Sequence, residues 1–142
     1  EEFLHVDIDK VIRMCLIHDL GECFIGDIPT FAKTDADEAR EEAELMAWVR
    51  SLPEPVSGEM EALYREMIEL ETPEAKLYKA MDKLEAIVQH NESDIATWEP
   101  HEYQLNMTYA DDAVAWSPVL HELREAIRND TKAKIAAAEQ QS

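Results

Sequence analysis

The chain has 142 residues, of which 46% are apolar, which suits one folded domain with a sizeable core rather than a disordered acidic tail. Its 13 basic and 32 acidic side chains give a formal charge of −19. This charge argues against a nucleic-acid polymer as partner, because phosphate backbones are bound by surfaces of Lys and Arg. No apolar run reaches the roughly 18 residues that a membrane span needs. We therefore expect one domain over residues 1–142 that binds neither a membrane nor a nucleic-acid strand.

Helical patterns begin near the start of the chain, and strands are not expected, because Gly is scarce and Val-Ile-Thr alternation is absent. Asp7 is placed to cap a helix that runs to about Leu20 and ends at Gly21. The expected buried side of this helix consists of Val11, Ile12, Cys15 and Leu16. A loop is predicted to follow from Phe24 to Lys33, which contains Gly26 and Pro29.

Two more helices are predicted in the middle of the chain. Thr34 and Asp37 form a capping-box pattern, which opens a helix that ends near Leu52. Ser57 is expected to start the next helix, which continues to about Leu70. Both segments are amphipathic, so we expect them to pack their apolar faces against a common core.

The last part of the chain combines regular and irregular patterns. Thr72 and Pro73 provide a cap followed by proline at the first helical position. The helix that they open has an apolar stripe of Leu77, Met81, Leu84 and Val88. An irregular segment is expected over 91–117 and a final helix over 118–139. The sequence thus predicts an all-α bundle of about five to six helices with its core in residues 7–90.

Polar groups gather where the first helix is expected to end, in the stretch LIHDLGECFIGDIP. His18 and Asp19 are adjacent, and at a helix end both side chains can lean toward one point, where an imidazole nitrogen and a carboxylate oxygen make two metal ligands. Glu22 follows one helical turn after His18, and Asp27 follows across a Gly-containing turn. The alternative is a helix-end pair that hydrogen bonds alone satisfy.

A second candidate position lies in the stretch YKAMDKLEAI. Asp82 falls inside the most amphipathic helix, although helix interiors disfavour Asp. Lys79, three residues earlier, shares its side of the helix. The two alternatives are a surface ion pair between Asp82 and Lys79, and a functional Asp82 with Lys79 available to a phosphate oxygen.

Taken together, the HDxxE and GDIP motifs and the distal A-K-x-x-K-x-x-D-K-x-E resemble the HD superfamily of metal-dependent phosphohydrolases, and more narrowly its 5′-deoxynucleotidase branch. The likeness covers roughly residues 7–90. The metal ligands that it implies are His18, Asp19 and Asp82. It further implies that Glu22 is a catalytic carboxylate and that Asp27 helps to orient or activate the water or the substrate.

One part of the family pattern has no match in the chain. The first histidine of the family lies on the helix before the HD helix. On one continuous helix, His5 would lie about 20 Å from His18, which is too far to share an ion. His90 would likewise lie about 12 Å from Asp82. We therefore expect an upstream helix that supplies this ligand, which agrees with a chain that starts without methionine.

The resemblance implies hydrolysis of nucleoside 5′-monophosphates, with deoxynucleotides as the expected substrates, by a water molecule that one divalent ion activates. Imidazole and carboxylate ligands suit manganese, cobalt, magnesium, iron or zinc. The alternative is an HD-fold binding or scaffold domain without catalysis, which the unmatched histidine favours. The two cysteines form no disulfide framework, in keeping with a reducing cytoplasm, and an apolar face beyond one small core is typical of a homodimer.

Overall fold

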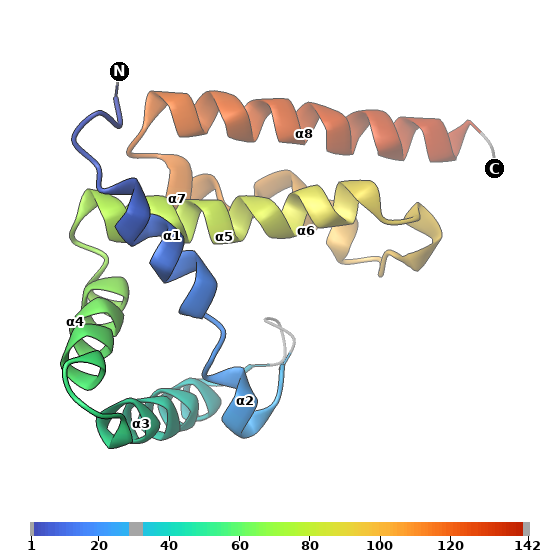
Figure 1. Ribbon diagram of the computed structural model, residues 1–142. Helices are drawn as coiled ribbons and strands as arrows, with labels where there is room; N and C mark the ends of the chain where they lie inside the picture. The colour runs from blue at the N-terminus through green and yellow to red at the C-terminus, as the bar shows by residue number, and fades with distance from the viewer. Residues whose placement is uncertain (1, 29–32, 141–142) are drawn as a thin grey trace. The chain divides into compact units, whose positions relative to one another are not determined.

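The computed structural model describes residues 2–28 and 33–140, and every regular element in these ranges is a helix (Figure 1). The helices of ten or more residues are α1 (Ile8–Ile17), α3 (Asp35–Ser51), α4 (Val56–Glu69), α5 (Pro73–Glu92) and α8 (Pro118–Glu139). The shorter ones are α2 (Glu22–Ile25), the 3₁₀ turn η1 (Ile95–Thr97), α6 (Glu102–Thr108) and α7 (Asp111–Val114). The predicted all-α class is confirmed. No helix in the described ranges is both long and apolar enough to cross a membrane.

The chain divides into two compact units. Asp7–Ala75 forms the first, which we call the N-terminal unit. The second, the C-terminal unit, comprises the described residues of Glu1–Val6 and Lys76–Ser142. The single domain expected over residues 1–142 stays a prediction.

The N-terminal unit is built around α4. This helix packs against α1 and α3, and the short α2 packs against α3. The largest side chains buried in this core are Val11, Met14, Leu45, Val49, Tyr64 and Met67. The packing holds the end of α1 and the turn after it against α3 and α4, which is where the HD motif lies.

The buried side of α1 differs from the prediction. Val11 and Met14 are buried, whereas Ile12 and Leu16 are 51% and 75% exposed and Cys15 lies at intermediate depth. Val11 and Met14 share one helix face because they are three residues apart, and Ile12 lies about 100° away from Val11. The prediction of Ile12 and Leu16 as buried residues was wrong, because the pattern could not show which apolar face α4 would cover.

Most predicted helix starts are confirmed by their caps. The side chain of Asp7 accepts a hydrogen bond from the backbone N–H of Lys10 at 3.0 Å. Thr34 and Asp37 form the reciprocal capping box at the start of α3. Ser117 caps α8 ahead of its first-turn proline. These short-range signals were readable because each cap lies within three residues of the group that it satisfies.

Four features of the elements differ from the prediction. α4 begins at Val56, with Pro55 as its N-cap, rather than at Ser57. α1 ends at Ile17 rather than Leu20, because the chain tightens into i→i+3 turns after it. α2 occupies part of the expected loop, whose Pro29 lies outside the described residues. The segment 91–117, expected to be irregular, contains η1, α6 and α7.

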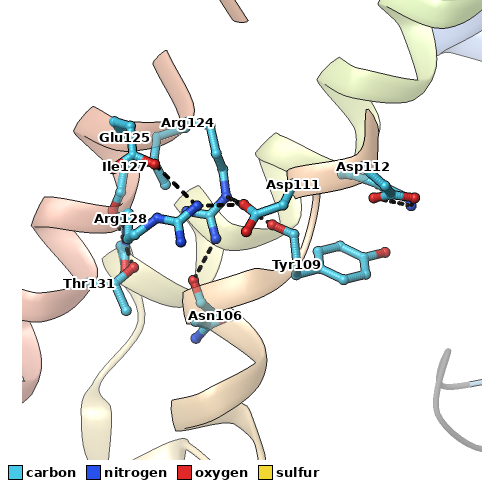
Figure 2. A network of polar contacts seen from close by, with 11 residues as sticks. Asn106, Tyr109, Asp111, Asp112, Arg124, Glu125, Ile127, Arg128 and Thr131 are labelled. Atoms are coloured by element: carbon cyan, nitrogen blue, oxygen red, sulfur yellow. Dashed lines mark hydrogen bonds and ion pairs between the residues drawn. The ribbon is translucent and has the colours of Figure 1, made fainter. Parts of the chain in front are cut away.

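In the C-terminal unit, α8 packs against η1, α6 and α7. Figure 2 shows that Arg124 of α8 lies at the centre of a polar network. Its Nε donates to the backbone oxygen of Tyr109 at 2.8 Å and its Nη2 donates to that of Asn106 at 3.0 Å. Nε also lies 3.1 Å from Oδ1 of Asp111. The fully buried Arg124 therefore satisfies backbone oxygens at the end of α6 and fastens the α6–α7 connection to α8.

Candidate metal centre

The end of α1 is held in place by a tyrosine of α4. The hydroxyl of Tyr64 donates to the backbone oxygen of Ile17 at 2.6 Å. Burial raises the pKa of Tyr64 to about 12, so the hydroxyl keeps its proton at neutral pH. The same oxygen accepts from the N–H of Leu20 at 3.1 Å. Tyr64 and Ile17 are 47 positions apart, and the sequence carried no signal for this long-range contact.

His18 and Asp19 meet at the end of α1, as predicted. Nδ1 of His18 lies 2.8 Å from the backbone oxygen of Cys15, and because a carbonyl oxygen only accepts, Nδ1 must carry a proton. Nε2 lies 3.0 Å from Oδ2 of Asp19. In a neutral imidazole both of these atoms are acceptors, so this distance calls for a cation or a proton between them.

This arrangement has the chemistry of part of a metal site. Metal-binding histidines usually donate their second ring N–H to a carbonyl or carboxylate, as Nδ1 of His18 does here. The side chain of His18 is 25% exposed and that of Asp19 is 62% exposed, so solvent can reach the pair. An imidazolium paired with a carboxylate has the same geometry, so the alternative of a helix-end ion pair also fits the contact.

Two more predicted site residues lie in the same turn. Glu22 begins α2, and its N–H donates to the backbone oxygen of Asp19 at 3.0 Å. Burial raises the pKa of Glu22, and the nearby carboxylates of Asp19, Asp27 and Glu41 raise it further. Asp27 is exposed and follows Gly26, whose φ of 89° favours glycine. The turn therefore places three predicted site carboxylates within electrostatic reach of one another.

Gly21 plays a different part from the predicted helix end. Its backbone is in the right-handed helical region, with φ of −59° and ψ of −34°. A Cβ at this position would lie 2.6 Å from Cγ and 2.7 Å from Oε1 of Glu41. Glycine is thus required here for the close approach of a side chain from α3, and not for its dihedral angles.

The carboxylate that lies against Gly21 also binds a lysine. Nζ of Lys33 lies 2.6 Å from Oε2 of Glu41. The hydrogen bond to Glu41 raises the pKa of Lys33 and outweighs the opposing effect of burial. The two residues are eight positions apart, a spacing for which helical periodicity predicts no contact, so the sequence did not identify either of them.

Asp82 and Lys79 form an ion pair in the C-terminal unit. Nζ of Lys79 donates to Oδ2 of Asp82 at 2.7 Å. Burial by itself lowers the pKa of Lys79, but the hydrogen bond and charge of Asp82 outweigh it, and the net shift is upward. The ion pair, which is one of the two alternatives that the sequence left open at this position, is therefore present.

The predicted site residues are distributed over both units. His18, Asp19, Glu22 and Asp27 belong to the N-terminal unit, and Lys79 and Asp82 belong to the C-terminal unit. Within residues 2–28 and 33–140 no group of three or more His, Cys, Asp or Glu side chains stands close enough to hold a metal ion. A common metal site of His18, Asp19 and Asp82 stays a prediction.

Known proteins resemble this chain over most of its length. A family described as "HD domain" matches residues 1–124. The 5′-deoxynucleotidase HDDC2 of Bos taurus is 30% identical over 137 residues, which cover 94% of this chain and 66% of the relative. The protein of the same name in Danio rerio is 32% identical over 103 residues, covering 71% of this chain and 52% of the relative. The one in Homo sapiens is 32% identical over 98 residues, covering 68% and 48%.

The chain thus spans about half to two thirds of the length of these curated relatives. No solved structure shows a significant match to it. Since the family match extends over residues 1–124 and the helical fold agrees with it, the chain belongs to the HD-domain family.

Proposed function

We propose that the chain is a metal-dependent phosphohydrolase that acts on nucleoside 5′-monophosphates, with deoxynucleotides as its preferred substrates. The structural observation that carries this proposal is the contact between Nε2 of His18 and Oδ2 of Asp19, which lie 3.0 Å apart at the end of α1. Membership of the HD-domain family supports the phosphohydrolase chemistry. The relatives named 5′-deoxynucleotidase support the substrate class.

His18, Asp19 and Asp82 are the residues that would hold the divalent ion, which is manganese, cobalt, magnesium, iron or zinc. When bound, such an ion polarises a phosphoryl oxygen and lowers the pKa of water. The hydrogen bond from Nδ1 of His18 to the backbone oxygen of Cys15 fixes the ring, so that the lone pair of Nε2 would be available to a metal ion. Lys79, paired with Asp82, is a candidate contact for a phosphate oxygen.

Glu22 and Asp27, the carboxylates of the turn, would transfer the proton and orient the substrate. Because burial and the neighbouring carboxylates raise the pKa of Glu22, its side chain is suited to hold a proton. It would position the attacking water or pass a proton to the 5′-oxygen of the departing nucleoside. Asp27 is exposed beside Glu22 and would orient the water or the substrate.

A non-catalytic binding or scaffold domain is the second candidate. It is favoured by the ion pair at 2.7 Å between Lys79 and Asp82, which can satisfy the carboxylate of a predicted metal ligand without a metal. A homodimer and a reducing, cytoplasmic setting stay predictions, and among the described residues neither Cys15 nor Cys23 belongs to a disulfide.

The test uses the full-length protein and measures phosphate release from a panel of deoxy- and ribonucleoside 5′-monophosphates with added cobalt or manganese, together with the amount of bound metal. We expect turnover by the wild-type chain and a loss on the order of a hundredfold or more, with loss of metal, in His18→Ala and Asp82→Asn. His121→Ala, which changes an exposed histidine of α8, is the control and should retain activity and metal. A wild-type chain that binds stoichiometric metal and hydrolyses no nucleotide would contradict the proposal.

A further inference from the structure

Lys33 places a positive charge beside the turn that carries His18, Asp19 and Glu22. The link is Glu41, whose Oε1 lies against Gly21 and whose Oε2 lies 2.6 Å from Nζ of Lys33. Gly21 directly precedes Glu22 in the chain. The ammonium group is therefore separated from the turn by a single carboxylate, and all of these residues belong to the N-terminal unit.

The surroundings of Lys33 are acidic. Asp19, Asp27 and Glu41 act on Glu22 as negative charges, and Lys33 is the cation that opposes them. A phosphate monoester carries up to two negative charges at neutral pH, so this turn would repel it without a cation close by. Clamps of Lys, Arg and divalent cations are the usual means of stabilising a transferring phosphoryl group.

The ion pair with Glu41 leaves Lys33 able to bind a further anion. An ammonium group has three N–H donors, and a contact with one carboxylate oxygen leaves others available. The side chain of Lys33 is 21% exposed, compared with 15% for Glu41, so the lysine reaches the surface. The contact with Glu41 also raises the pKa of Lys33, whose ordinary value of 10.5 already leaves the ammonium group charged at neutral pH.

We propose that Lys33 contacts the phosphate group of the substrate, and that Glu41, seated against Gly21, is the positioning residue that holds Lys33 in place. This inference rests on the proposed function, because it assigns Lys33 to the same phosphoryl-transfer site. Lys33 contributes a point charge to phosphate binding, and Glu41 acts only through Lys33.

The competing explanation is that the ion pair between Lys33 and Glu41 only fastens the start of α3. Substituting each residue in turn by glutamine distinguishes the two explanations. A fastening pair is broken by Lys33→Gln or by Glu41→Gln, so both variants would weaken phosphate binding alike. If Lys33 binds phosphate, Lys33→Gln weakens binding. Glu41→Gln then keeps it or tightens it, because the amide oxygen still accepts from Lys33 while the competing negative charge is gone.

The experiment uses the full chain with cobalt and inorganic phosphate as the probe, measured as a competitive inhibitor of nucleotide hydrolysis and directly by calorimetry. We expect Lys33→Gln to raise KM and the phosphate inhibition constant about tenfold, the effect of one hydrogen bond to a charged group, with a smaller change in kcat. Lys33→Arg retains the cation and should retain binding, which keeps the inference testable if the glutamine variant folds poorly.

Lys10→Gln is the matched control. It removes the same charge from a half-buried Lys–Glu pair in the same unit, in which Nζ of Lys10 lies 3.1 Å from Oε1 of Glu66 near the other end of α1. This variant should bind phosphate as the wild type does. Equal losses in Lys33→Gln and Glu41→Gln, or a Lys33→Gln variant that binds phosphate within twofold of wild type, would overturn the inference.

The two proposals fail in different ways. If the wild-type protein binds stoichiometric metal and hydrolyses no nucleotide, the proposed function is wrong, and calorimetry with inorganic phosphate still decides whether Lys33 binds the anion. If the wild type and Lys33→Gln both hydrolyse nucleotides with the same KM, the proposed function stands and the proposed role of Lys33 in phosphate binding is wrong.

Discussion

Charged side chains are treated differently in the two units. In the C-terminal unit, Arg124 is fully buried, and two backbone oxygens and the carboxylate of Asp111 surround it (Figure 2). In the N-terminal unit, Asp19, Glu22 and Asp27 gather on a turn that solvent reaches. A buried arginine that donates to backbone oxygens fastens a fold, although Nη1 of Arg124 has no hydrogen-bond partner of its own among the described residues. Carboxylates that repel one another on a surface turn reduce stability instead, and such local conflicts mark functional sites.

The largest effect is expected when the buried Arg124 of the C-terminal unit is substituted. Arg124→Met should lower the free energy of unfolding by about 3–5 kcal/mol, because it leaves the backbone oxygens of Asn106 and Tyr109 and the carboxylate of Asp111 with fewer partners. Chemical denaturation followed by circular dichroism measures the change.

Arg50→Met provides the control for that substitution. Arg50 pairs with Glu61 at the surface of the N-terminal unit at 2.9 Å, and exposed pairs of this kind contribute little. Its unfolding curve should superimpose on that of the wild type. An Arg124→Met curve that also superimposes would show that the buried network carries no stability.

The next effect tests how tightly the turn is packed against α3. Gly21→Ala should lower the free energy of unfolding by about 1 kcal/mol or more and reduce metal affinity, because its Cβ would displace Glu41 from the turn. Thermal unfolding and metal titration measure the two changes.

Gly58→Ala is the matched control within the same unit. Its Cβ would lie 3.1 Å from the end of the flexible Glu54 side chain, and alanine is favoured over glycine inside a helix such as α4. This variant should therefore be as stable as the wild type or more so. Equal stability of Gly21→Ala and wild type would show that Glu41 moves aside without cost.

The smallest effect is a pH dependence at the start of α1. The backbone N–H of Asp7 donates to Oε1 of Glu74 at 2.9 Å, and this hydrogen bond lowers the pKa of Glu74. The stability that Glu74 contributes is therefore complete above the ordinary glutamate pKa of 4.5, and it is lost as the pH falls through the lower value of the folded state.

Glu74→Gln should accordingly lower the melting temperature by on the order of a few degrees at pH 7, and the gap to wild type should narrow below about pH 4. Thermal scans from pH 3 to pH 7 measure this, with the exposed Glu69→Gln as a control that should show no gap. If the difference in melting temperature between Glu74→Gln and wild type stayed constant from pH 3 to pH 7, the charge of Glu74 would not be involved.

Most helices could be predicted because their signals are local. The caps at Asp7 and Thr34 act within three residues. Glu22 and Asp27 were singled out by the family resemblance, and the structure places Glu22 at the start of α2 rather than on a continuation of α1. The apolar pattern of α1 failed for Ile12 and Leu16, because an amphipathic stripe does not reveal how much of it a neighbouring helix covers.

The sequence by itself determined the all-α class, most helix starts and the adjacency of His18 and Asp19, because backbone hydrogen bonds and caps depend on neighbours within one or two turns. Only the tertiary structure decided that Tyr64 holds the end of α1 and that Gly21 makes room for Glu41 and Lys33. Such contacts join residues far apart in the chain, and their partners are chosen by the packing of whole helices against one another.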